Sequence, residues 1–199
     1  DYGGTHLHVA GRMAEVVTGK AWNALFADIL ATPLGVTGAA YFASPRQGAG
    51  ERNPLVAGGL RISTLGYLEL LALHFHKGRH RGVTVGRPVD FDEAAREPYP
   101  GVKVGTSPAA AASRSFRYGL ASWLECDTPA TGCATISSPG AFGFTPWVDR
   151  DAGYYAIVAM ELPNAMGGVV KLSIDLEQAL QPAIRAALGV LIGPAIVSS

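Results

Sequence analysis

Apolar side chains recur at helical spacing along the first part of the chain. Between residues 7 and 17 they stand three or four positions apart, and Gly19 follows as a helix-ending residue. The same spacing returns from Trp22 to Leu30 and stops before Pro33. These two patterns predict two consecutive amphipathic helices near the start of the chain.

A long irregular segment separates these helices from a third. Residues 33–62 are dense in glycine and proline, which favours turns and loops. Ser63 is a suitable N-cap for a helix that carries regularly spaced leucines and is closed by Gly78. Residues 90–96 predict one further short helix, and residues 98–101 predict a turn.

The period of the pattern then changes to that of short strands. Aromatic and β-branched residues gather in four segments separated by turns: 116–124, 134–138, 141–148 and 154–161. Residues 149–153 read as a hairpin turn. The continuously apolar run 155–160 is typical of a strand covered on both faces. Asp175 to Leu188 predicts a closing helix, with Pro182 as a possible kink.

Helices followed by an antiparallel meander and a final helix indicate an α+β fold. We expect a helical lobe portion in residues 1–112 and an antiparallel sheet portion with its C-terminal helix in residues 113–199. Among the 199 residues, 48% are hydrophobic and 16% charged, which predicts a globular chain with a substantial core.

Charge and hydropathy exclude two classes of partner. The 16 basic and 16 acidic residues give a formal net charge of zero, and no basic stripe or basic-aromatic cluster is present, so we expect no nucleic-acid partner. No apolar run reaches the roughly 18 to 20 residues of a membrane span. The apolar end segment 186–197 is interrupted by glycine and proline, and it is interpreted as a packed terminal segment.

The two cysteines are close in sequence and enclose a turn-rich segment. Cys126 and Cys133 are predicted to form a disulfide across a hairpin tip, and the alternative is a pair of buried free thiols. Two sulfurs alone do not indicate a metal site. A bridge would stabilise the fold by about 2 kcal/mol in the loop-entropy model and would place the protein outside the reducing cytosol.

Three stretches carry a family resemblance. They are Val9–Trp22 with Pro33–Val36 behind it, Asn53–Thr64, and the run Ser137–Asp149, which reads SSPGAFGFTPWVD. Together they resemble the penicillin-recognising serine hydrolases, namely class C β-lactamases, D-Ala-D-Ala carboxypeptidases and related esterases. The resemblance implies a β-lactamase/transpeptidase-like fold in which residues 53–64 are a scaffold turn bordering the cleft.

One element of that family is missing from the chain. Its nucleophile lies in a Ser-x-x-Lys turn, yet no serine or threonine stands three residues before any lysine; the lysines are Lys20, Lys77, Lys103 and Lys171. The chain is therefore expected to be the C-terminal portion of such an enzyme. Its fold would be incomplete without an N-terminal part that supplies the serine helix and the earlier strands.

The resemblance implies a set of site residues. Tyr2 matches a proton-transferring tyrosine of a Tyr-x-Asn element, with Gly4 in the asparagine position, which weakens recognition of an amide side chain. The alternative for Tyr2 is packing at a loop-helix junction. Ser138-Pro139-Gly140 falls where the family has Lys-Thr-Gly or His-x-Gly on the strand lining the cleft.

The residues after this triplet complete the predicted site. The Ala141 N–H would be an oxyanion donor, and Phe142 would lie with Ser138 and Gly140 among the substrate-binding residues. Ser138 replaces a cationic or imidazole group, so capture of a substrate carboxylate is weakened and an esterase-like activity is favoured. The alternative is a strand with a Pro-Gly bend and no chemistry.

The histidines do not indicate a metal centre. His6 and His8 are two residues apart, as are His74 and His76, and at that spacing two helical side chains point away from each other. No glycine-rich phosphate-binding motif follows a predicted strand. We therefore expect no metal and no cofactor.

Two functions follow from these observations. The first is the C-terminal portion of a secreted or periplasmic serine acyl hydrolase, esterase- or β-lactamase-like, which acts through an acyl-enzyme on a small ester, amide or β-lactam. Its nucleophile would come from outside this chain, and the N-terminal portion of the same protein or a second copy would complete the sheet. The second is a non-catalytic binding or structural module with the same fold.

Overall fold

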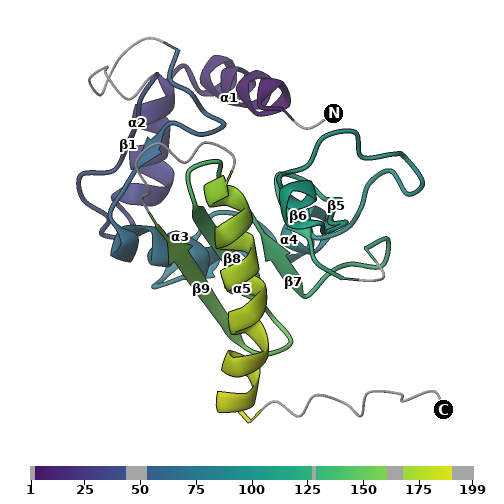
Figure 1. Ribbon diagram of the computed structural model, residues 1–199. Helices are drawn as coiled ribbons and strands as arrows, with labels where there is room; N and C mark the ends of the chain where they lie inside the picture. The colour runs from purple at the N-terminus through teal and green to yellow at the C-terminus, as the bar shows by residue number, and fades with distance from the viewer. Residues whose placement is uncertain (1–2, 44–52, 127–128, 161–167, 190–199) are drawn as a thin grey trace, which may run out of the picture. The chain divides into compact units, whose positions relative to one another are not determined.

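The chain folds into two compact units, residues 1–93 and residues 94–199. The computed structural model in Figure 1 describes residues 3–43, 53–126, 129–160 and 168–189. The fold is mixed, with helices, antiparallel strands and a C-terminal helix, as the sequence predicts. The expected boundary between residues 112 and 113, which divides a helical portion from a sheet portion, differs from the boundary between these compact units and stays a prediction.

The first unit contains the predicted helices. Its elements are α1 (Thr5–Thr18), α2 (Trp22–Phe26), the π-helical turn η1 (Ala27–Ala31), β1 (Ala40–Tyr41), β2 (Leu60–Arg61), α3 (Thr64–Phe75), β3 (Arg79–His80), β4 (Val83–Thr84) and α4 (Pro88–Ala94), whose last residue belongs to the second unit. Gly19 ends α1 in the left-handed conformation, with its N–H on Glu15 O. The Ser63 hydroxyl accepts from the Gly66 N–H and caps α3.

Side chains of α2 and η1 anchor the core of the first unit. Phe26, Ala31, Leu34, Val36 and Leu73 form one buried cluster. The Asn23 side-chain amide donates to Tyr41 O at 2.8 Å, and its oxygen accepts the Tyr41 N–H at 2.7 Å. This pair of hydrogen bonds joins α2 to β1, which pairs antiparallel with β2.

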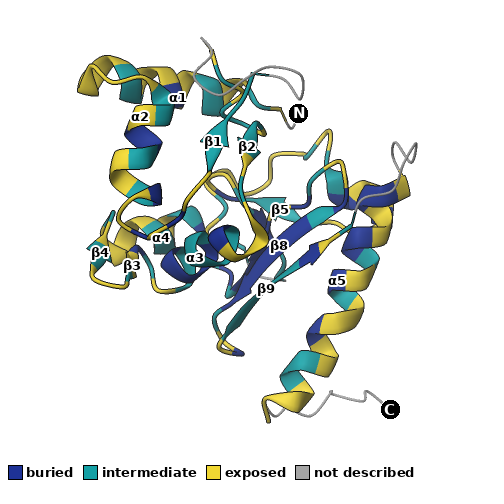
Figure 2. Cartoon of the chain, turned by 90° about the vertical axis from the view of Figure 1, so that its left-hand side faces the viewer, coloured by how far each residue is buried: buried dark blue, intermediate teal, exposed yellow. Residues whose placement is uncertain are grey.

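Helix α1 is largely exposed among the described residues, as Figure 2 shows. Gly11 is its buried residue, while Val9, Met13, Val16 and Val17 are all more than half exposed. The helical spacing of its apolar residues is confirmed, but that apolar face is not covered by the described part of the chain.

The second unit is built on a five-stranded antiparallel sheet. Its elements are the 3-10 helix η2 (Pro108–Ala112), β5 (Arg117–Tyr118), β6 (Trp123–Leu124), β7 (Thr135–Ser137), β8 (Phe144–Asp149), β9 (Tyr154–Ala159) and α5 (Gly168–Ala187). The strands lie in the order β5-β6-β7-β8-β9, each hydrogen-bonded to the next. All four predicted strand segments contain strands, and segment 116–124 turns back on itself to give both β5 and β6.

Burial within the sheet centres on β8. Five of the six β8 residues are buried, whereas most of β9 is half-buried and Ala159 is exposed. The expectation of a strand covered on both faces at 155–160 therefore does not hold in the described structure. The physical reason is position: β8 has a bonded neighbour on each side, while β9 lies at the edge of the described sheet.

Helix α5 packs along β8 and β9, as Figure 1 shows, and also against η2. It begins at Gly168, seven residues before the predicted start, and Pro182 lies inside it. Ile174 and Val170 join Ala112 in a small apolar cluster. No helix in the described part of the chain is both long and apolar enough to cross a membrane.

The interface between α5 and the sheet is unusually polar. The buried polar residues of the described chain all lie on β7, β8 or α5: Thr135, Ser137, Thr145, Asp149, Ser173, Glu177 and Gln181. By contrast, Leu172, Leu176 and Leu180 on α5 are 43%, 40% and 42% exposed. The helix thus turns a polar stripe inward and leaves a leucine stripe largely uncovered.

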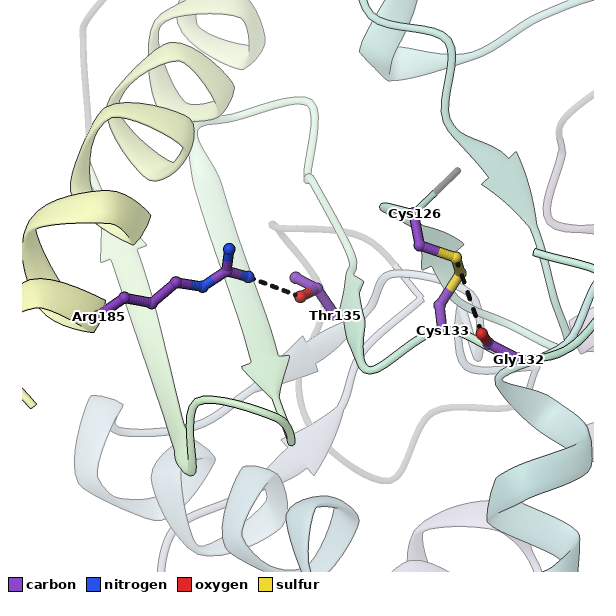
Figure 3. The surroundings of a disulfide bond; sticks show 5 residues. All are labelled: Cys126, Gly132, Cys133, Thr135 and Arg185. Atoms are coloured by element: carbon purple, nitrogen blue, oxygen red, sulfur yellow. Dashed lines mark hydrogen bonds between the residues drawn. A yellow bond between two sulfur atoms is a disulfide. The ribbon is translucent and has the colours of Figure 1, made fainter. Parts of the chain in front are cut away.

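One ion pair joins the end of β8 to the last turns of α5. Arg185 Nε donates to Asp149 Oδ2 at 2.8 Å, and Arg185 Nη2 donates to Thr135 Oγ1 at 3.2 Å. The carboxylate of Asp149 is fully buried, and its other oxygen accepts the Ala152 N–H of the hairpin turn. Figure 3 shows Arg185 reaching across to Thr135 at the start of β7.

The predicted disulfide between Cys126 and Cys133 is present, with the Cα atoms 5.7 Å apart. It joins the segment that follows β6 to the segment that precedes β7, as Figure 3 shows. The Cys133 N–H donates to Ala95 O and the Glu97 N–H to Pro129 O, so the bridged loop also holds residues 95–97.

We expect Arg185→Met to lower the free energy of unfolding by about 3 kcal/mol, because it leaves the buried Asp149 carboxylate without its cation. The measurement is chemical denaturation of the chain. The matched control is Lys171→Met, which breaks an exposed pair with Asp175 on the same helix and should cost less than about 0.5 kcal/mol. Equal losses in the two variants would contradict the structural role assigned to Arg185.

We expect the double variant Cys126→Ser/Cys133→Ser to lose about 2 kcal/mol of stability, because the unfolded chain regains the entropy of the closed loop. Reductant should destabilise the wild-type chain by a similar amount and leave the variant unchanged. A wild-type chain that is insensitive to reductant would argue against the bridge.

Candidate functional site

The predicted site residues of the second unit lie in one tight hairpin. Ser138, Pro139 and Gly140 directly follow β7, and Ala141, Phe142 and Gly143 connect them to β8. The Gly140 N–H donates to Phe144 O at 2.8 Å, and the Gly143 N–H donates to Gly140 O at 3.1 Å. Gly143 has a φ of 84°. This is a three-residue hairpin loop, a turn closed by a left-handed glycine.

The loop presents Ala141 to solvent. Ala141 and Phe142 are the two central residues of the turn, and both are exposed, Phe142 to 79%. Nothing in the described part of the chain accepts a hydrogen bond from the Ala141 N–H. A backbone N–H held at a rigid turn and open to solvent can donate to the oxygen of a bound carbonyl.

The loop has little room to move. A Cβ added at Gly143 would overlap Val169 Cγ1 at the start of α5 and Met160 Cγ, so the glycine is required by close packing as well as by its φ. Gly140 is less constrained, with Phe144 O 3.0 Å from such a Cβ. The first turn of α5 therefore supports the loop from behind.

A proline interrupts the ladder beside Ser138. The Ser138 N–H donates to Pro146 O at 3.1 Å, but Pro146 has no N–H to return to the Ser138 carbonyl. Proline is rare in a strand with neighbours on both sides, and β8 is such a strand. The ladder between β7 and β8 is thus weakened at the first residue of the predicted triplet.

The predicted triplet and loop have no charge of their own. Ser138 is exposed, Pro139 is buried, and none of residues 138–142 carries an ionisable side chain. Ser137, directly before them, pairs with Trp123 on β6 and Trp147 on β8, and its buried hydroxyl has no hydrogen-bond partner in the described chain. Recognition at this loop can use backbone groups and apolar contact.

The remaining predicted residues stand near the start of the chain. Tyr2 lies outside the described residues. Gly4 is the N-cap of α1, where a Cβ would come 2.7 Å from the Ala57 Cβ. An asparagine could not replace Gly4 in this structure without moving residue 57. The segment containing Ala57 belongs to the glycine turn 53–64 that was predicted as scaffold.

The predicted residues thus fall into two groups. The structure brings Ser138, Gly140, Ala141 and Phe142 together in one loop. Gly4 belongs to the other unit, and the meeting of its element with this loop stays a prediction.

Sequence reasoning missed the polar residues behind the site. Asp149 was noted only as the last residue of the resembling run, and Arg185, Thr135, Glu125 and Glu177 were not singled out. The signal available was the spacing of Ser173, Glu177 and Gln181, four residues apart on one face of α5. Such a stripe ordinarily faces solvent, so only the fold reveals that it faces the sheet.

The described residues offer no metal centre. No three histidine, cysteine, aspartate or glutamate side chains in that part of the chain come together as a metal ion would require. His80 Nε2 lies 2.7 Å from Glu69 Oε2, and its ring stacks on that of His76. These histidines contribute to local packing and pairing in the first unit.

No protein-family model and no curated protein sequence matches the chain. Solved structures do. A Bacteroides dorei protein assigned as a β-lactamase is similar at 27% identity with a TM-score of 0.70. The match covers 89% of this chain and 57% of the Bacteroides dorei chain. A β-lactamase of Mycobacterium bovis has 17% identity and a TM-score of 0.66, covering 92% of this chain and 64% of its own.

The third solved structure has a different named activity. A mutant of the simvastatin synthase LovD of Aspergillus terreus has 16% identity and a TM-score of 0.65, covering 92% of this chain and 54% of its own. The chain spans less than two thirds of the length of each of these three structures. They share a β-lactamase-like fold with it.

We expect Gly143→Ala to cost about 2 to 4 kcal/mol, because it combines an unfavourable positive φ with overlap onto Val169 and Met160. Gly153→Ala is the matched control. Gly153 has a similar φ of 78° but nothing within 4 Å, so it should lose only about 1 kcal/mol. Thermal unfolding of both variants measures the difference, and equal losses would mean that α5 does not support the loop.

Proposed function

Starting from the relationship of this chain to the serine β-lactamase and penicillin-binding-protein-like family, we propose that it is the C-terminal portion of a serine acyl hydrolase. The nucleophile is supplied by polypeptide outside this chain. It attacks the carbonyl of a small ester, amide or β-lactam and forms an acyl-enzyme. The observation that carries the proposal is the rigid loop 141–143, with its solvent-facing backbone donor next to the segment that resembles the family's cleft strand.

In this proposal each site residue has a defined part. The Ala141 N–H donates to the developing oxyanion, and Gly140 keeps the strand edge open to substrate. Phe142 contacts the apolar part of the substrate, since its ring is exposed next to that donor. Tyr2 moves the proton of the attacking serine and needs a nearby cation to lower its pKa from about 10.

The lack of charge at the loop favours esters over substrates recognised by a carboxylate. Residues 138–142 offer no cation, so the electrostatic capture made by lysine or histidine in the resembled family is missing. Simple esters need no such capture. We therefore place ester hydrolysis before β-lactam or peptide hydrolysis.

Two surfaces of the second unit support an added N-terminal portion. β9 has no strand beyond it in the described sheet, and an open edge favours pairing with another strand. The leucine stripe of α5, formed by Leu172, Leu176 and Leu180, is substantially exposed. We propose that the N-terminal portion of the same protein pairs with β9 and covers this stripe, and pairing with a second copy is the alternative outcome.

The protein is proposed to act in the cell envelope or outside the cell. The Cys126–Cys133 disulfide supports this location, because such bridges persist in oxidising compartments.

The first test compares this chain with the product of the longer reading frame that contains it. We expect the chain alone to show no hydrolysis of p-nitrophenyl butyrate above buffer and no labelling by a fluorophosphonate. The longer protein should show both. Turnover and labelling by the chain alone at the level of the longer protein would overturn the external nucleophile, and inactivity of both would favour the non-catalytic module.

The second test removes the proposed oxyanion donor in the longer protein. Ala141→Pro deletes the N–H at the first central position of the turn, where proline is tolerated. We expect kcat to fall by about 10² to 10³ with unchanged thermal stability. Ala141→Gly, which keeps the N–H, is the control and should retain most activity. An equal loss in both variants would contradict the assignment.

A further inference from the structure

Two glutamates and two glutamines form a closed group where α5 meets the end of β6. Gln178 Nε2 donates to Glu125 Oε2 at 2.7 Å and to Glu177 Oε2 at 2.9 Å. Gln181 Nε2 donates to Glu125 Oε2 at 3.0 Å and also to Glu177 Oε1. Both amide groups thus bridge the same pair of carboxyl groups, and Glu177 is fully buried.

The four amide hydrogens do not satisfy this pair. Glu125 Oε1 is buried and has no hydrogen-bond partner in the described chain. The groups that act on the pKa of Glu177 are Glu125, Gln178 and Gln181. Glu177 in turn acts on the hydroxyl of Tyr154 on β9, as do Asp149 of β8 and Arg185 of α5. Arg185 is already bonded to Asp149 and Thr135. Among the described groups that act on the pKa of Glu177, none is a cation.

A shared proton resolves both problems. If one of the two carboxyl groups is protonated, its O–H can donate to the other, and only one negative charge remains to be buried. We propose that Glu125 and Glu177 form a proton-dependent clasp, which holds the middle turns of α5 on the sheet while the pair carries one proton and releases them when it is lost.

The ionisation of Glu177 supports this clasp. The pKa of Glu177 is raised to about 8, mainly by burial and then by the charge of Glu125 and a hydrogen bond with Glu125, while Gln178 and Gln181 act in the opposite direction. This value lies above the ordinary 4.5, so between pH 4.5 and about pH 8 the folded chain binds more protons than the unfolded chain. The stabilisation is therefore present at low pH and lost as the pH rises through about 8.

The release is expected to stay local. The Arg185–Asp149 pair binds α5 eight residues further on, and Thr145 donates to Ser173 one turn before Glu177. Neither contact loses a partner when the glutamate pair ionises. This inference does not rest on the proposed acyl-hydrolase function.

The test compares the pH dependence of wild type and Glu177→Gln. The glutamine imitates the protonated acid, since its amide can donate to Glu125 Oε1. We expect the unfolding equilibrium constant of the wild type to rise between pH 5 and 8, by up to about tenfold per pH unit beyond that of Glu177→Gln. Comparing the two chains cancels the histidine titrations they share.

Hydrogen exchange locates the effect. In the wild type, protection of residues 174–181 should fall between pH 6 and 9 after correction for intrinsic exchange, while β7 and β8 keep theirs. Glu177→Gln should stay protected throughout. Asp175→Asn removes an exposed carboxylate of the same helix and should retain the wild-type profile.

Several results would overturn the clasp. One is a pH profile of stability that is the same in wild type and Glu177→Gln. Another is a loss of protection spread equally over α5 and the sheet. If Glu177→Gln does not fold, Glu125→Gln provides the second variant. A pH dependence of stability in that variant equal to that of the wild type would also overturn the clasp.

Discussion

The buried pair between Arg185 and Asp149 is the contact on which the second unit depends. A fully buried carboxylate is costly to desolvate and is tolerated when a cation and further donors satisfy it. Here the guanidinium of α5 and the N–H of Ala152 do so, and Arg185 also reaches Thr135. One side chain of the C-terminal helix thereby joins the start of β7, the end of β8 and the hairpin turn after it.

This anchoring bears directly on the candidate site. β7 and β8 are the two strands that flank the loop carrying Ala141 and Phe142, and the opposite end of α5 packs Val169 against Gly143. Helix α5 therefore contacts this hairpin at both of its ends: at the loop itself, and at the opposite ends of β7 and β8. A backbone donor is useful in catalysis only when its position is fixed before the substrate arrives, and this packing provides such preorganisation.

The polar side of α5 has a second consequence. Ser173, Glu177 and Gln181 face the sheet, while the leucine stripe one position earlier remains exposed. Hydrophobicity alone would rotate the helix the other way. The orientation follows from the partners available on the sheet, since Thr145 and Glu125 provide matching polar groups. The exposed leucines form a second face of the helix that is suited to apolar contact.

Local sequence signals determined much of the fold. Gly19 and Ser63 end and begin their helices because a left-handed C-terminal residue and a side-chain cap are short-range requirements. The disulfide between Cys126 and Cys133 and the hairpin at residues 149–153 were also predictable, because their determinants lie within a few residues of one another. The family resemblance rested on contiguous runs for the same reason.

Other features were decided only by the tertiary structure. The start of α5 at Gly168 and the inward turn of Glu177 depend on contacts with strands that lie far away in the sequence. The edge position of β9 could not be inferred from its apolar composition, because strand order is a long-range property. The sequence by itself thus determined most of the elements, although it predicted a strand from residue 141 where the structure has the loop 141–143 before β8. Packing decided which faces of these elements meet. A helix cap is set by residues next to it in the sequence, whereas the residue that packs against a given face lies far away along the chain and cannot be identified from local sequence.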